Sequence, residues 1–429
     1  MKIAVTGLWH LGLVTAACLA NAGYEVVAYD PDEKLIADLN QHKTPIMEPG
    51  LDDMLAASMS KQNLTYTANI EQLKNQDIIW VTYDTPVNDQ DEADVEYVTD
   101  QIKQFFPFLT NNTIVILSSQ LPVGTGRCLQ KAYQENYSNQ VTFVSIPENL
   151  RLGNAIRIFT QPDRIIVGLQ EQNDKAKIEK LLSPFSTNII WMNLESAEMT
   201  KHALNAFLAM SVTFINELAI LCEKVGANAS EVEKGLKSEE RIGPKAYVRP
   251  GGAIGGGTLL RDINYLNQLG KRVDEPTHLF SAIIKSNHYH KNWINRKLKS
   301  IFNTIENKTL GVLGLTYKTS TDTLRRSTSV DLCRALANEG MTIFAFDPVI
   351  TSIPSDIAHF IQLKKSISEA INKVDCVLVL TEWPEFRELT AENFLKEVNQ
   401  PLLIDPTAYL SQTLGNHSPI QYHSVGRSL

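Results

Sequence analysis

The fold is decided by the first stretch of the chain, residues 1–31, which read MKIAVTGLWHLGLVTAACLANAGYEVVAYDP. Apolar runs and glycines alternate in it, which predicts a buried strand over 3–6, a glycine turn over 7–12, a helix over 13–21 closed by Gly23, and a second strand over 24–29. This order of elements is a βαβ unit, in which the two strands pair in parallel.

The same order of elements occurs a second time near the C-terminus. A strand over 310–313 leads to Gly314, and Leu-Ala-Asn-Glu-Gly at 336–340 matches Leu-Ala-Asn-Ala-Gly at 19–23. Each copy is followed by a further apolar strand, at 77–81 and at 375–380, as expected where helices cover both faces of a parallel sheet. The sequence therefore predicts an α/β protein with two Rossmann-like, doubly wound parallel-sheet domains.

A long apolar segment over 195–223 lies between the two copies. A helix that is apolar on most of its circumference must be buried, so we expect a long central helix that joins the two domains and supplies a homodimer interface. The predicted domains are 1–194, 195–295 with the central helix, and 296–429.

The composition narrows the possible partners. The 429 residues carry a formal net charge of −8, which disfavours nucleic acid and an anionic membrane surface, since both reward clustered Lys and Arg. The five cysteines are scattered and lack CxxC spacing, and the histidines lack metal-ligand spacing, so neither disulfides nor a metal site is predicted. His10 interrupts the first apolar stretch, which argues against a signal peptide and for a cytoplasmic protein.

The glycine turn predicts a dinucleotide site. Such a turn needs three small positions, and here they hold Gly7, Trp9 and Gly12. Asp30 stands about twenty residues beyond the turn, where an acid takes the ribose hydroxyls of NAD and repels the added phosphate of NADP. We expect NAD, with the indole of Trp9 pointing away. The alternative is a Rossmann-like fold that no longer holds a dinucleotide.

Segments along nearly the whole chain resemble the UDP-glucose/GDP-mannose dehydrogenase family in order and spacing. The similar segments are 45–51 (PIMEPGL), 85–86, 121–125 (LPVGT), 147–148, 162–164, the helix with Lys201 and Asn205, 241–243, 247–262 and 314–327. The resemblance implies NAD-dependent oxidation of a nucleotide sugar, and the region around Arg241 favours a UDP-sugar.

The resemblance also implies roles for individual residues. Lys201 would stabilise an oxyanion, Asn205 would orient the sugar, and Glu148 and Asp262 would serve water attack and proton transfer. From helical spacing alone, Glu198, Lys201 and Asn205 share one helix face and can point into a cleft. The cofactor would be bound by Gly7, Trp9, His10, Leu11, Gly12, Asp30, Thr85, Pro86, Gln120 and Arg325. The substrate would be bound by Glu148, Leu150, Arg241 from the partner subunit, Tyr247, Gly255, Gly256, Tyr317 and Lys318.

The glycine-rich loop 249–258 departs from the family at its last residue. So many glycines forfeit folding entropy, which indicates close approach to a ligand. Where the family has a cysteine nucleophile this chain has Thr258. An unassisted alcohol cannot replace a thiolate, whereas hydride transfer needs no nucleophile. Three outcomes stay open: a two-electron product, oxidation of a hydrated aldehyde with Glu148 as base, or a protein that only binds a nucleotide sugar.

Overall fold

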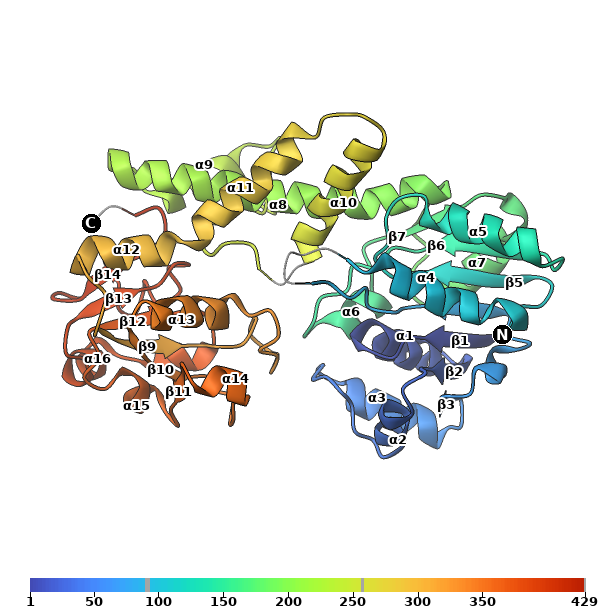
Figure 1. Ribbon diagram of the computed structural model, residues 1–429, viewed down its shortest axis with the longest axis horizontal. Coiled ribbons are helices and arrows are strands. Elements are labelled where there is room, and N and C mark those ends of the chain that lie inside the picture. The colour runs from blue at the N-terminus through green and yellow to red at the C-terminus, as the bar shows by residue number, and fades with distance from the viewer. Residues whose placement is uncertain (89–92, 256–257, 428–429) are drawn as a thin grey trace. The chain divides into compact units, whose positions relative to one another are not determined.

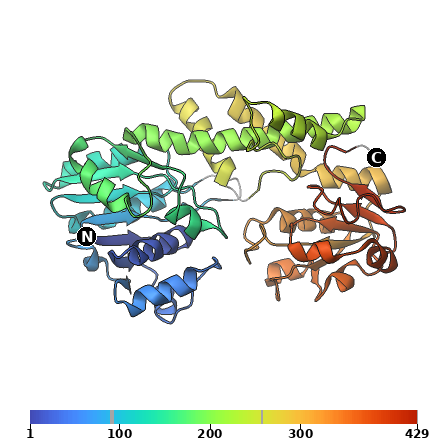
Figure 2. The same cartoon turned by 180° about the vertical axis from the view of Figure 1, so that it is seen from behind.

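The computed structural model describes residues 1–88, 93–255 and 258–427, and it divides into two compact units, Met1–Leu204 and Asn205–Leu429. Each unit contains one sheet flanked by helices (Figures 1 and 2). The helix α8, Leu194–Val225, runs from the first unit into the second. This confirms the predicted α/β class with two parallel-sheet domains and a long central helix.

The sheet of the first unit has eight strands in the order β3-β2-β1-β4-β5-β6-β7-β8, and only β6 and β7 pair antiparallel. Its strands are β1 Lys2–Thr6, β2 Glu25–Tyr29, β3 Leu64–Thr67, β4 Ile78–Val81, β5 Thr113–Leu117, β6 Val141–Ser145, β7 Ile165–Leu169 and β8 Ile189–Met192. Its helices are α1 His10–Asn21, α2 Glu33–Asn40, α3 Leu51–Ser60, α4 Val95–Gln104, α5 Thr125–Asn136, α6 Ala155–Thr160 and α7 Lys175–Leu182.

The sheet of the second unit has six strands, all parallel, in the order β11-β10-β9-β12-β13-β14. Its strands are β9 Thr309–Leu313, β10 Thr342–Phe346, β11 Gln362–Leu363, β12 Cys376–Val379, β13 Leu402–Ile404 and β14 Gln421–His423. Its helices are α9 Ala229–Ser238, α10 Thr258–Arg272, α11 His278–Lys291, α12 Trp293–Phe302, α13 Thr328–Asn338, α14 Ser355–Ala358, α15 Ile367–Ile371 and α16 Ala391–Glu397.

Both sheets are buried on both faces, which explains why their strands read as continuous apolar runs. In β1 the side chains of Ile3 and Val5 enter one hydrophobic cluster, while Ala4 between them enters another. In the second unit Val312 and Leu313 likewise belong to different clusters. Successive residues of a strand point to opposite faces, so a sheet covered on both faces favours apolar residues at most strand positions.

The central helix α8 is not fully buried within this single chain. Phe207 and Phe214 are 63% and 50% exposed, and Leu221 is 61% exposed. These three residues are seven apart and form one apolar stripe on α8. The helix is long and apolar enough to cross a membrane, but 44% of its most apolar window is buried inside the protein, and a core helix has the same composition.

Candidate active site

The glycine turn after β1 has the backbone that a dinucleotide site needs. Gly7 has φ +89°, and a Cβ on Gly12 would lie 1.9 Å from the carbonyl oxygen of Gly7, so neither position tolerates a side chain. Trp9, the residue before α1, is 40% exposed, so its side chain lies at the surface and outside the core. No described side chain caps the N-terminus of α1, which leaves its first N–H groups for a phosphate.

Asp30 lies at the end of β2, next to this turn. Its Oδ2 accepts a hydrogen bond from the backbone N–H of Leu8 at 2.7 Å, and its Oδ1 accepts one from the N–H of Asp32 at 3.0 Å. Burial raises the pKa of this carboxyl, and the two N–H donors counteract that effect. The carboxylate is therefore fixed beside the glycine turn, where NAD would place its ribose.

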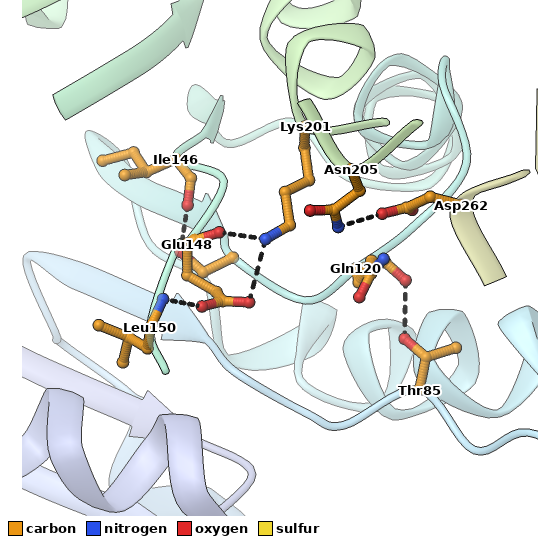
Figure 3. Close-up of polar contacts among 9 residues, drawn as sticks. Thr85, Gln120, Ile146, Glu148, Leu150, Lys201, Asn205 and Asp262 are labelled. Atoms are coloured by element: carbon orange, nitrogen blue, oxygen red, sulfur yellow. Dashed lines mark hydrogen bonds and ion pairs between the residues drawn. The ribbon is translucent and has the colours of Figure 1, made fainter. Parts of the chain in front are cut away.

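Thr85 and Gln120, two further candidates for binding the cofactor, connect the loops that follow β4 and β5. The hydroxyl of Thr85 donates to the carbonyl oxygen of Gln120 at 2.8 Å, and both residues are buried (Figure 3). The carbonyl oxygen of Pro86 accepts the N–H of Asp94, the cap of α4, at 2.8 Å. Arg325 lies elsewhere, exposed in the loop after β9 of the second unit, so its place near the cofactor stays a prediction.

Lys201 and Glu148 form a polar pair in the first unit, in which Lys201 is buried and Glu148 is half-buried. The Nζ of Lys201 donates to the carbonyl oxygen of Glu148 at 2.6 Å and lies 3.5 Å from its Oε1 (Figure 3). The Oε2 of Glu148 accepts the N–H of Leu150 at 2.5 Å, so the carboxylate also folds its own loop. Both side chains line a small cavity together with residues 117–121, Ser145, Pro147 and Glu198.

Glu198 lines this cavity but has a structural partner. Its two carboxylate oxygens accept the N–H groups of Gly124 and Gly126 at 2.6 and 2.8 Å, at the N-terminus of α5. Burial raises the pKa of this carboxyl. The carboxylate of Glu198 holds the start of α5 in place, because exposed helix N–H groups attract a carboxylate.

Asn205 and Asp262 form a second polar pair, in the second unit. The Nδ2 of Asn205 donates to Oδ2 of Asp262, which is fully buried on α10 (Figure 3). Thr258 is the exposed first residue of α10. Residues four apart lie on one helix face, so Thr258 and Asp262 project from the same side of α10. Lys201 and Asn205 are likewise one turn apart on α8.

The glycine-rich loop has partners within its own unit. The N–H of Gly251 donates to Oδ1 of Asn216 at 3.0 Å, and the N–H of Ile254 donates to Oδ1 of Asn287 at 2.7 Å. A Cβ on Gly255 would lie 2.5 Å from a methyl group of Thr328. Intramolecular packing therefore explains part of the glycine content that the sequence had indicated as ligand contact. Gly256 lies outside the described residues.

The remaining substrate candidates are surface groups of the second unit. Tyr247 and Tyr317 are 60% and 39% exposed, and Lys318 is half-buried. Arg241 is exposed, and its Nε donates to Oε1 of Glu239 at 2.7 Å. These positions leave the side chains accessible to a ligand or to a second subunit.

The cysteines offer no activated thiol. All five are free; burial raises the pKa of the Cys18 and Cys333 thiols to about 12, and raises that of Cys376 further. Cys222 is buried on α8, and Cys128 is exposed on α5. A thiol with a raised pKa is a poor nucleophile near neutral pH. Within the described part of the chain, no group of three or more His, Cys, Asp or Glu is arranged to hold a metal.

Sequence reasoning missed Glu48. This residue is 5% exposed, and its carboxylate accepts hydrogen bonds from His10, Gly153 and Ala155. Glu48 lies in segment 45–51, whose resemblance to the family assigns it no role. No local pattern marks Glu48, because its donors lie on α1 and about a hundred residues further along the chain.

Three domain descriptions of one family match this chain. The NAD binding domain of the UDP-glucose/GDP-mannose dehydrogenase family matches residues 1–186, its central domain matches 195–289, and its UDP binding domain matches 311–412. The chain is 34% identical to UDP-glucose 6-dehydrogenase TuaD of Bacillus subtilis, over 99% of this chain and 93% of that protein. It is 33% identical to UDP-glucose 6-dehydrogenase of Rhizobium meliloti, over the full length of both.

Solved structures have the same fold. A UDP-glucose dehydrogenase from Pyrobaculum islandicum superposes with a TM-score of 0.90 at 24% identity, over 100% of this chain and 98% of that one. A UDP-D-ManNAc dehydrogenase from Pyrococcus horikoshii gives 0.86 at 24% identity, over 100% and 99%.

Proposed function

This chain belongs to the UDP-glucose/GDP-mannose dehydrogenase family and is an NAD-dependent nucleotide-sugar dehydrogenase, and from that premise we propose that it oxidises a UDP-sugar of the UDP-glucose type and stops at a two-electron product. The observation that carries the proposal is the buried Lys201 ammonium, held at 2.6 Å by the Glu148 carbonyl. It is joined by Thr258, which stands where the family resemblance implies a cysteine nucleophile.

The cofactor supplies a hydride acceptor when bound, and the residues of the chain supply positioning and charge. Gly7, Gly12 and the N-terminus of α1 fit a pyrophosphate, and Asp30 fits a ribose. When the alcohol C–H bond breaks, its electron pair leaves as hydride and negative charge develops on the oxygen. The Lys201 ammonium, which lines a small cavity, is pre-placed to stabilise that charge.

Asn205 and Asp262 supply orientation and proton transfer. Asn205 donates to the buried Asp262 carboxylate, which fixes the amide and leaves its carbonyl oxygen for a sugar hydroxyl. We assign Asp262 to receiving the hydroxyl proton. Recognition of the uridine diphosphate falls to Tyr317 and Lys318, because residues 311–412 match the UDP binding domain. Tyr247 and the loop with Gly255 lie in the part that matches the central domain, and we assign them to the sugar. Gly256, a further candidate in this loop, lies outside the described residues.

Thr258 is the reason for a two-electron product. A second oxidation through an enzyme-bound ester requires a nucleophile that is ionised near neutral pH, which a threonine hydroxyl is not. The described cysteines do not replace it, because the thiol on α8, Cys222, is buried about five turns from Asn205.

The decisive experiment counts electrons. The purified chain is incubated with a known amount of UDP-glucose and excess NAD, and NADH is measured at completion. One NADH per sugar supports the proposal, and two per sugar contradict the two-electron limit. No NADH, with UDP-glucose binding in a calorimeter, indicates a protein that binds nucleotide sugars without oxidising them. Other UDP- and GDP-sugars in the same assay test the specificity.

A matched pair of variants tests the role of Thr258. Thr258→Cys restores a thiol at the start of α10, and we expect it to raise the yield from one to two NADH per sugar. Thr258→Ser keeps an alcohol there and should leave the yield at one. An unchanged yield in the cysteine variant would show that the limit has another cause.

We also propose a cytoplasmic homodimer. The apolar stripe of α8 (Phe207, Phe214 and Leu221) exposes three large side chains whose burial would stabilise association. Five free thiols suit a reducing compartment. In such a dimer Arg241 would serve the sugar site of the partner.

A further inference from the structure

Glu48 connects two segments that the proposed function assigns to different ligands. One segment is the glycine turn 7–12, which would bind NAD, and the other is the loop 148–154, whose Glu148 contacts Lys201. The Oε2 of Glu48 accepts a hydrogen bond from Nε2 of His10 at 2.8 Å and another from the N–H of Gly153 at 2.7 Å. One oxygen atom therefore contacts both segments.

The second oxygen of Glu48 extends this connection. Its Oε1 accepts the N–H of Ala155, the first residue of α6, at 2.8 Å. Asn154, the residue before α6, makes no capping bond with its side chain, so Glu48 caps this helix from more than a hundred residues away in sequence. The end of the loop 148–154 is thus fixed by Glu48. Two residues before this loop, the carbonyl oxygen of Ile146 accepts a hydrogen bond from the Ser118 hydroxyl at 2.6 Å.

Burial makes the carboxylate of Glu48 dependent on its hydrogen-bond donors. The side chain of Glu48 is 1% exposed and that of His10 is 15% exposed. A buried carboxylate needs its donors, because each lost hydrogen bond leaves charge without solvation. A shift of His10 is therefore accompanied by a shift of Glu48 and of the N–H groups of Gly153 and Ala155.

His10 is placed to sense the cofactor. It is the first residue of α1, the helix whose N-terminal N–H groups would face the pyrophosphate of NAD in the proposed site. We propose that Glu48 is a positioning residue that transmits NAD binding at the glycine turn, through His10, to the loop that carries Glu148. The proposal rests on the proposed function only in taking the turn as the NAD site and the loop as the substrate loop.

Amide hydrogen exchange tests this coupling without turnover. NAD should slow exchange at Gly153 and Ala155 in the wild-type protein by about 3- to 10-fold, the range of one strengthened hydrogen bond. His10→Ala removes the link and keeps both bonds from Glu48 to the loop. With NAD above the dissociation constant measured for each protein by calorimetry, the variant should show less than twofold slowing. Its NAD affinity should fall by about 3- to 10-fold.

Two further variants complete the test. His288→Ala makes the same substitution at an exposed site of α11 and should behave as the wild type does. Glu48→Gln places an NH2 group against one of its N–H donors, so Gly153 and Ala155 should exchange faster even without NAD. Melting temperatures show whether each variant is folded. If Glu48→Gln does not fold, the comparison of wild type with His10→Ala is sufficient to test the proposal.

The proposal is overturned if bound NAD slows exchange equally in wild type and His10→Ala, or in neither. Failure of the proposed function has a different signature, namely absence of NADH with every nucleotide sugar. Because hydrogen exchange and calorimetry require only NAD, the coupling can be tested whether or not the chain oxidises a nucleotide sugar.

Discussion

Lys201 owes its position to a main-chain oxygen as much as to a carboxylate. Its Nζ lies closer to the Glu148 carbonyl than to the Glu148 carboxylate, 2.6 Å against 3.5 Å. The ammonium is thus held in place without complete neutralisation, which leaves it able to stabilise a developing negative charge.

Replacing Lys201 tests this role. We expect Lys201→Ala to lower kcat by about 100- to 1000-fold, the usual cost of removing one preorganised charge from an oxyanion site. The dissociation constant of NAD should stay within twofold, because Lys201 lies outside the glycine turn. Steady-state NADH formation and calorimetry measure the two quantities. Lys131→Ala, at an exposed site on α5, is the control; equal losses in both variants would contradict the role.

His423 predicts a pH dependence of stability. This buried imidazole at the end of β14 has its pKa lowered from 6.5 to about 4, first by burial and then by nearby Lys297. A lowered folded-state pKa gives stability that is present above pH 6.5 and is lost as the pH falls towards 4, by about 3 kcal/mol in all.

The substitution His423→Gln should flatten this part of the pH profile, because glutamine does not titrate. The free energy of unfolding, measured by denaturant titration at pH 7 and pH 4.5, should fall less in the variant than in the wild type. His417→Gln, at an exposed site, should leave the profile unchanged. A variant profile as steep as that of the wild type would show that other groups cause the loss.

The candidate site could be predicted from sequence only in part. Resemblance and helical spacing identified Lys201, Asn205 and Glu148, and the structure places them in polar pairs. Spacing could not tell that Glu198 bonds to α5, because the partner lies 72 residues away. It also missed Glu48, whose donors are more than a hundred residues away in sequence or on α1.

At the scale of elements, the strands were predicted within one or two residues, because both faces of each sheet are apolar. The start of α1 was predicted three residues late, at 13 in place of 10. The reason is physical: Trp9 precedes the helix without any capping side chain, so the sequence has no start signal there. Likewise, the periodicity of α8 could not tell an apolar face that is buried from one that is exposed.

The apolar stripe of α8 leads to a prediction about association. Phe214→Glu puts a charge at the centre of the stripe and should convert the proposed dimer into a monomer, because an unpaired buried charge costs several kcal/mol. Light scattering at micromolar concentration measures the mass. Tyr97→Glu, at an exposed aromatic residue of α4, should leave the mass unchanged. A wild-type protein that is already monomeric would remove the dimer from the proposal.

At the scale of the whole molecule, two similar folds have acquired different polar sites. In the first unit Asp30 accepts two backbone N–H groups and is half-buried. At the corresponding place in the second unit Asp347 is 2% exposed, and one oxygen accepts bonds from Leu315, Thr316 and the indole of Trp383. The carboxylate of Asp347 is buried and already accepts hydrogen bonds from within the protein, so it is not available to bind a ribose.

This asymmetry predicts one NAD per chain. A calorimetric titration should give a stoichiometry of one, and Asp30→Ala should weaken binding by about 10-fold or more, since a bond to a charged group is worth roughly 1.5–3 kcal/mol. Asp32→Ala, at the exposed cap of α2, is the matched control and should bind NAD with an affinity much closer to that of the wild type. Two NAD per chain would contradict the asymmetry.

The uneven burial of the thiols has a practical use. Four of the five cysteines are buried, and Cys128 alone is exposed, on the helix α5 whose first turn is bonded to Glu198. A maleimide dye or a nitroxide will therefore attach at Cys128, and no other cysteine has to be removed by mutation. Its fluorescence or resonance signal would report how the beginning of α8 responds when a nucleotide arrives.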